Sequence, residues 1–122
     1  MKVLIIDDAD AVRPRLADAL REIEGLDVSS FAPRAGGIIQ RILERKPDVV
    51  VIDIGMPGGA LDLVRAIKAG TRPPVVIALS SSSSIQYRAA CHHAGAEYFF
   101  DKVREQARMV EAVAELQKEL AC

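Results

Sequence analysis

Acidic, hydroxyl and ammonium side chains follow the ends of several short apolar runs in this sequence. Asp7 and Asp8 follow VLII, Asp53 follows VVVI, Ser80 follows VVIAL, and Lys102 comes shortly after YFF. A buried carboxylate needs a charged or hydrogen-bonding partner. The segment IGMPGG after Asp53 offers no side chain that could pair with an acid. The partner of Asp53 must therefore come from elsewhere in the fold or from a ligand.

Three carboxylates brought together repel one another and favour a bound cation. Oxygen ligands in a shallow, hydrated site suit Mg²⁺, and a glycine such as Gly55 lets a backbone carbonyl approach it. A metal beside Asp53 can orient a phosphoryl group and neutralise its charge, while Lys102 can hold another phosphoryl oxygen. This chemistry would make Asp53 a nucleophile that accepts a phosphoryl group.

Strand-like runs alternate with segments of helical periodicity along the whole chain. The predicted strands are Val3 to Asp7, Val28 to Phe31, Val49 to Asp53, Val75 to Leu79 and Tyr98 to Phe100. The predicted helices contain Val12 to Ile23, Ile38 to Leu43, Leu61 to Ile67 and Ser83 to Ala94, with a last helix from about Val103 to the end. This alternation predicts an α/β fold, a doubly wound parallel sheet with helices on both faces.

The predicted sheet would bring the polar residues to one edge. Ligands of open parallel sheets bind beyond the carboxyl ends of the strands. The continuous runs VLII and VVVI are typical of central strands, whereas the more polar DVSSF suits a strand nearer an edge. We therefore expect three carboxylates, a hydroxyl and an ammonium on one rim, with Asp101 beside Lys102.

Length, charge and cysteine content narrow the classes of function. A chain of 122 residues suits one domain. The charges nearly balance, with 16 Lys plus Arg and 17 Asp plus Glu, so no overall basic field attracts nucleic acid or an anionic membrane. The apolar runs are shorter than a membrane span. Cys91 and Cys122 form no CxxC pair, which argues against a disulfide framework or zinc site and favours a reduced, cytoplasmic setting.

Four motifs in order resemble the receiver domain of two-component response regulators, and the resemblance covers essentially the whole chain. They are LIIDD, DIGMP, ALS and AGAEYFFDK. The resemblance implies a single receiver domain over residues 1–122, without an output domain, and a flavodoxin-like (βα)5 fold with strand order 2-1-3-4-5. It also implies a phosphorylation-controlled switch in a two-component phosphorelay, which is not a classical enzyme but promotes its own aspartyl phosphorylation and dephosphorylation.

Site residues carry over from the family by position. The resemblance implies that Asp53 accepts the phosphoryl group from a histidine kinase or a histidine phosphotransfer protein. It assigns the remaining roles as follows: Mg²⁺ bound by Asp8, Asp53 and the Gly55 carbonyl, with Asp7 acting through water; phosphoryl oxygens bound by Ser80 and Lys102; and Phe99 at the aromatic switch position. The signal would reach a downstream protein through the fourth helix, the fifth strand and the fifth helix.

This sequence departs from the family pattern in two loops. Many members have a proline with a cis peptide bond after the lysine, whereas here Val103 follows, so we expect a trans bond. MPGGALDLV is one residue shorter than usual before the third helix, with Ala60 nearest the position of the family's glycine. Local structure in both loops should differ accordingly.

Other interpretations of the same residues remain open at this point. Asp8 and Asp10 fit the DxDx[TV] motif of haloacid dehalogenase phosphatases, as nucleophile and general acid. That interpretation leaves Asp53 and DIGMP unexplained. A receiver-like module that binds its partner without phosphate is another alternative, distinguished by whether binding depends on Asp53.

Two further groups have simple structural interpretations. Asp10 is a candidate N-cap of the first helix, with Pro14 tolerated in the first turn. Cys91, His92 and His93 are adjacent on a predicted helix and point in different directions, so ordinary helix surface is expected rather than a metal site.

Overall fold

Five parallel strands form one sheet in the order β2-β1-β3-β4-β5 in the computed structural model, which describes residues 1–32, 37–55, 59–81 and 85–121. The strands are β1 (Lys2–Ile6), β2 (Asp27–Phe31), β3 (Val49–Asp53), β4 (Val75–Ser80) and β5 (Tyr98–Asp101). The helices are α1 (Arg13–Arg21), α2 (Ile38–Arg45), α3 (Ala60–Lys68), α4 (Ile85–Ala94) and α5 (Gln106–Ala121). The predicted fold class and strand order are confirmed.

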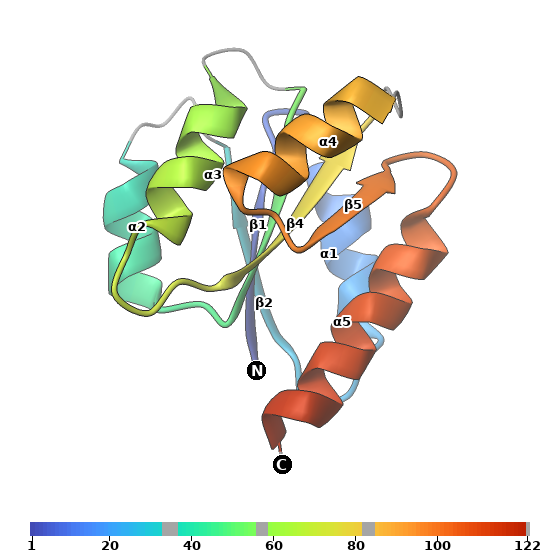
Figure 1. Ribbon diagram of the computed structural model, residues 1–122. Coiled ribbons are helices and arrows are strands. Elements are labelled where there is room, and N and C mark those ends of the chain that lie inside the picture. Colours follow the sequence, from blue (N-terminus) through green and yellow to red (C-terminus); the bar gives the residue numbers. More distant parts are fainter. Residues whose placement is uncertain (33–36, 56–58, 82–84, 122) are drawn as a thin grey trace.

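Helices cover both faces of the sheet, as Figure 1 shows: α1 and α5 lie on one face, and α2, α3 and α4 lie on the other. Alternation within each strand builds a separate core on each side. Val3 and Ile5 of β1 pack with α1 and α5, whereas Leu4 and Ile6 pack on the opposite face. Every residue of β3 is buried, as expected for the middle strand of a doubly covered sheet.

Strand register brings the polar residues to one edge of the sheet. Asp53 is paired with Leu79, so the ends of β3 and β4 lie side by side. Ser80 is paired with Asp101, which places the start of the Lys102 segment next to the end of β4. Asp7 follows directly after β1. Three strands and the turn after β5 therefore deliver their chemical groups to the same rim.

Some predicted element boundaries are wrong. The fifth helix begins at Gln106 rather than near Val103, because residues 102–104 form a turn. Asp10 does not cap the first helix: Val12 occupies the N-cap position, and the Asp10 carboxylate contacts Arg13 at 2.9 Å. The predicted helix start at Ser83 lies outside the described residues.

The loop into α3 is described only in part. The predicted Met-Pro of DIGMP, at 56 and 57, lies outside the described residues. The helix itself begins at Ala60, after Gly59 in a left-handed conformation with φ 83°. Among the described residues, no helix has both the length and the apolar character needed to cross a membrane.

Gly95 ends α4 in a conformation that only glycine adopts easily, with φ 116°. A Cβ atom there would lie 2.8 Å from Cγ of Lys68. Gly95→Ala should therefore lower the free energy of unfolding by about 1–3 kcal/mol, measured by urea denaturation. Gly70→Ala is the matched control, because its Cβ would make only ordinary contact, 3.5 Å from the Ile67 carbonyl. Equal effects of the two substitutions would contradict this explanation.

Candidate functional site

An acidic cluster lies at the carboxyl edge of the sheet. Carboxylate oxygens of Asp7, Asp8 and Asp53 lie within 4.8 Å of one another. Asp7 and Asp53 are buried, while Asp8 is partly exposed. The buried runs VLII and VVVI carry these acids to the edge because they form adjacent central strands. The structure thus brings together the three carboxylates predicted from the sequence.

Lys102 lies against this cluster. Its Nζ atom is 2.7 Å from Oδ2 of Asp7 and 3.0 Å from Oδ2 of Asp53. Burial lowers the pKa of Lys102, but hydrogen bonds to Asp7 and Asp53 and the attraction of both carboxylates outweigh that effect, so its pKa lies above the ordinary value. The ammonium is therefore charged at neutral pH and partly neutralises the acids.

Backbone amides donate hydrogen bonds to one carboxylate oxygen of Asp53 and one of Asp7. The Gly55 N–H donates to Oδ1 of Asp53 at 2.9 Å, and the Ala9 N–H donates to Oδ1 of Asp7 at 2.8 Å. These bonds fix the orientation of both carboxylates. The other oxygen of each acid, Oδ2, faces Lys102. The unpaired appearance of Asp53 in the sequence is thus resolved by a backbone amide and a distant lysine.

The donor set fits a hard divalent cation. Oδ2 of Asp7 is buried, and the ammonium of Lys102 lies 2.7 Å from it. One ammonium cannot balance three clustered carboxylates, so the cluster retains negative charge that favours a further cation. Three carboxylates provide the oxygen atoms that Mg²⁺ prefers. The residues present therefore fit a magnesium ion.

Ser80 and Phe99 lie on neighbouring strands but in different surroundings. Ser80 is buried at the end of β4, and its carbonyl accepts a hydrogen bond from the Lys102 N–H at 2.8 Å. Phe99 is buried in the core beneath α2, α3 and α4. The guanidinium of Arg88 lies 4.8 Å from the centre of the Phe99 ring. Phe99, which the resemblance places at the aromatic switch position, is thus in contact with Arg88 of α4.

Sequence comparison with known proteins identifies the family to which a chain with this site belongs. The family model of the response regulator receiver domain matches residues 3–114. The response regulator GacA of Pseudomonas syringae pv. syringae (strain B728a) is 32% identical over 114 residues, which cover 93% of this chain and 53% of the relative. The chain belongs to the receiver domain family of response regulators.

A second relative and a solved structure are also similar to this chain. The receiver domain is 32% identical over 101 residues to KdpE, the KDP operon transcriptional regulatory protein of Escherichia coli (strain K12), covering 82% of this chain and 44% of the relative. Its fold matches the signal receiver domain of NarL from Mycobacterium tuberculosis with a TM-score of 0.82 and 24% identity, covering 96% and 95% of the two chains. The chain spans about half the length of the GacA relatives it matches.

Membership in the receiver family does not favour the phosphatase interpretation of Asp8 and Asp10. Within the described structure, the Asp10 carboxylate lies outside the acidic cluster and contacts Arg13. The receiver domain therefore retains Asp8 as a cluster member and Asp10 as a surface residue, 64% of whose side chain is exposed.

The prediction that Cys91 lies on the helix surface is wrong. Cys91 belongs to α4, and it is fully buried in the core that this helix covers. Burial raises the pKa of its thiol. Its two neighbours, His92 and His93, are exposed. Nδ1 of His92 lies 3.0 Å from the Ala96 carbonyl. Among the described residues, the metal-compatible group of side chains comprises Asp7, Asp8 and Asp53 and does not include these three.

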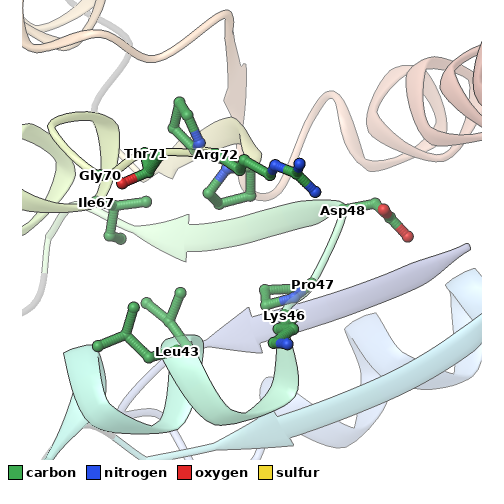
Figure 2. Close-up of a pocket in the computed structure, with 11 residues that line it drawn as sticks. Leu43, Lys46, Pro47, Asp48, Ile67, Gly70, Thr71 and Arg72 are labelled. Atoms are coloured by element: carbon green, nitrogen blue, oxygen red, sulfur yellow. The ribbon is translucent and has the colours of Figure 1, made fainter.

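A hollow of about 530 Å³ lies at the opposite edge of the sheet. Figure 2 shows Leu43 of α2 and Ile67 of α3 on opposite sides of it, with Pro47 at its inner end. Its lining comes from segments that precede β3 and β4, whereas the acidic cluster follows strand ends. This hollow is therefore separate from the receiver site.

Sequence reasoning missed the side chains that organise the Lys102 turn. Asp101 was predicted only as a further acid on the rim, yet its Oδ1 accepts hydrogen bonds from the Val103 and Arg104 N–H groups at 2.9 and 2.8 Å. Oε1 of Glu105 accepts a hydrogen bond from the Asp101 N–H at 3.0 Å. The signal was present as an aspartate followed four residues later by a glutamate, a spacing close to that of a capping box.

Proposed function

We propose that Asp53 is the phosphoacceptor of this receiver domain and that Mg²⁺ is required for its phosphorylation. One observation carries the proposal: a single ammonium bridges the buried carboxylates of Asp7 and Asp53 within a cluster that includes Asp8. Such a site would supply the nucleophile, the cationic contact and the metal ligands that phosphoryl transfer needs. Histidine kinases phosphorylate receiver domains of response regulators, and a phosphohistidine is the proposed donor.

The transfer is an in-line displacement at phosphorus. An Oδ atom of Asp53 forms a P–O bond while the P–N bond to the donor imidazole breaks, and the released imidazole nitrogen takes up a proton. Bound Mg²⁺ would supply positive charge that orients the phosphoryl oxygens and reduces their repulsion with the acids. Asp8, Asp53 and the Gly55 carbonyl would hold it directly, with Asp7 acting through water.

Lys102 and Ser80 bind the transferred group in this proposal. The ammonium already touches Oδ2 of Asp53, so a phosphoryl group on that residue lies within its reach. The hydroxyl of Ser80 belongs to the adjacent strand end and can donate to a second phosphoryl oxygen. Because the same groups would also stabilise the charge that develops when water attacks the phosphoaspartate, we propose that the domain promotes its own dephosphorylation.

We propose that phosphorylation changes the surface formed by α4, β5 and α5. This surface would bind a protein partner, without direct contact to nucleic acid. The Phe99 ring is already buried, and the guanidinium of Arg88 lies over it. We therefore propose that phosphorylation favours this inward packing over alternatives. Phe99→Leu should weaken the dependence of partner binding on phosphorylation, whereas an unchanged dependence would contradict the switch role.

The composition also supports a cytoplasmic location as part of this proposal. The two cysteines show no disulfide-type spacing, and Cys91 is a buried free thiol. Retention of a fluorescent fusion in the soluble cytoplasmic fraction would agree with this location. Recovery from an exported fraction would contradict it.

Intact-mass analysis with a small acyl phosphate donor and Mg²⁺ tests the central proposal. We expect the mass of one phosphoryl group to appear on the wild-type chain and to be absent after Asp53→Asn or with a chelator. Asp62→Asn is the matched control, because that aspartate is exposed and paired with Arg65 on α3. Incorporation that persists in Asp53→Asn would contradict the assignment.

A further inference from the structure

A turn held by two carboxylates carries Lys102 between β5 and α5. Asp101 is buried, with only 7% of its surface exposed. Its Oδ1 accepts the Val103 and Arg104 N–H groups, while its own N–H donates to Oε1 of Glu105. The Glu105 N–H in turn donates to the Asp101 carbonyl at 3.0 Å. The two residues therefore close the turn from both ends.

The same turn sets the position of the ammonium. The Lys102 N–H donates to the Ser80 carbonyl at 2.8 Å, which attaches the turn to the end of β4. From this anchored backbone, Nζ reaches Asp7 and Asp53 at 2.7 and 3.0 Å. Neither Asp101 nor Glu105 belongs to the group of carboxylates that could hold a cation. Any effect of Asp101 and Glu105 on phosphoryl transfer must therefore come from their hold on the turn rather than from direct contact with the phosphoryl group.

We propose that Asp101 and Glu105 are positioning residues that hold Lys102 in its bridging geometry for phosphoryl transfer. The inference rests on the proposed function of Asp53. Val103, which follows the lysine through a trans peptide bond, cannot impose a rigid turn by itself. The Asp101 and Glu105 hydrogen bonds supply that rigidity, and a lysine placed in advance loses less conformational freedom when it binds the phosphoryl group.

The test measures initial rates of phosphoryl incorporation from a small acyl phosphate at saturating Mg²⁺. Asp101→Ala, which removes the acceptor, should slow incorporation about tenfold. Asp101→Asn keeps a side-chain oxygen for the two amides and should restore most of the rate. Val103→Ala is the matched control in the same turn, because its side chain is 80% exposed and its N–H is retained.

A double-mutant cycle separates positioning from general destabilisation. If Asp101 acts through Lys102, Asp101→Ala should cause little further slowing in a Lys102→Ala background. An equal slowing in both backgrounds would overturn the inference, as would a wild-type rate in folded Asp101→Ala. If Asp101→Ala does not fold, Glu105→Ala replaces it in the cycle, because that substitution removes the side-chain contact to the Asp101 N–H and keeps the Asp101 carboxylate. Arg108→Ala is its control, because Glu105 also pairs with Arg108 at 3.4 Å.

Magnesium affinity distinguishes the positioning of Lys102 from a simple loss of helix capping, because loss of capping alone would not tighten Mg²⁺ binding. Releasing Lys102 from Asp7 and Asp53 should tighten Mg²⁺ binding to Asp101→Ala, measured by calorimetry with Mg²⁺ alone, and Asp101→Asn should remain near wild type. Unchanged Mg²⁺ affinity in folded Asp101→Ala would also overturn the inference. If the wild type accepts phosphate while these comparisons fail, the positioning role alone is wrong. A wild type that accepts none overturns the proposed function as well.

Discussion

Lys102→Ala should slow phosphorylation of Asp53 by about 100-fold at saturating Mg²⁺, on the scale seen when one preorganised donor to a developing charge is removed. The structure gives the reason: Nζ is the cationic group within 3.0 Å of Oδ2 of Asp53 and is held there before any phosphoryl group arrives. The measurement is the initial rate of phosphoryl incorporation by intact mass. Lys118→Ala, at an exposed position on α5, should keep the wild-type rate.

The same substitution should strengthen Mg²⁺ binding. The ammonium and the cation compete for Asp7 and Asp53, so removing the ammonium leaves more negative charge for the metal. We expect several-fold tighter binding, on the order of 1 kcal/mol after discounting for the partly exposed site. A Lys102→Ala variant with a normal phosphorylation rate and unchanged Mg²⁺ affinity would contradict the role assigned to the lysine.

Ile52→Ala should lower the free energy of unfolding by about 2–5 kcal/mol. Ile52 is fully buried on the middle strand, where it belongs to the core beneath α2, α3 and α4. Truncation removes apolar contacts and leaves a cavity that close-packed neighbours fill only in part. This loss is a large fraction of the roughly 5–15 kcal/mol that typically stabilises a domain. Urea denaturation measures it.

Leu43→Ala provides the comparison for Ile52→Ala, because Leu43 lies on α2 with 63% of its surface exposed. The free energy of unfolding should change by no more than about 0.5 kcal/mol. Similar losses in the two variants would contradict the burial argument. Any Ile52→Ala protein that remains folded should still be phosphorylated, since Asp53 keeps its carboxylate and its lysine contact.

The strands and the main site were predictable because burial and strand ends leave strong signals. VLII and VVVI are apolar on both faces, and they occupy the central positions β1 and β3. DVSSF is more polar, and it forms the edge strand β2. Once a parallel sheet is inferred, Asp53 and the acids after β1 must meet at its carboxyl edge. Local sequence and global topology agree at these positions.

Features that depend on loop hydrogen bonds or helix rotation were not predictable in the same way. α5 begins later than predicted because residues 102–104 form a turn, in which the Asp101 carboxylate accepts the Val103 and Arg104 amides. Cys91 is buried because it lies on the side of α4 that faces the sheet. The apolar residues of α4 have only weak helical periodicity, so the sequence gives little indication of which side faces inward. The Lys102 contacts likewise require a tertiary fold, since 49 residues separate this lysine from Asp53.

Mapping the modified residue tests the central claim most directly. The protein is phosphorylated with a small acyl phosphate and Mg²⁺, then treated with borohydride, which reduces the acyl phosphate to an alcohol and marks the residue that carried it. Protein without the donor is treated in parallel. Peptide mass spectrometry should place the mark on Asp53 alone. A mark on Asp8, or phosphoryl incorporation with Asp53 unmodified, would contradict the account.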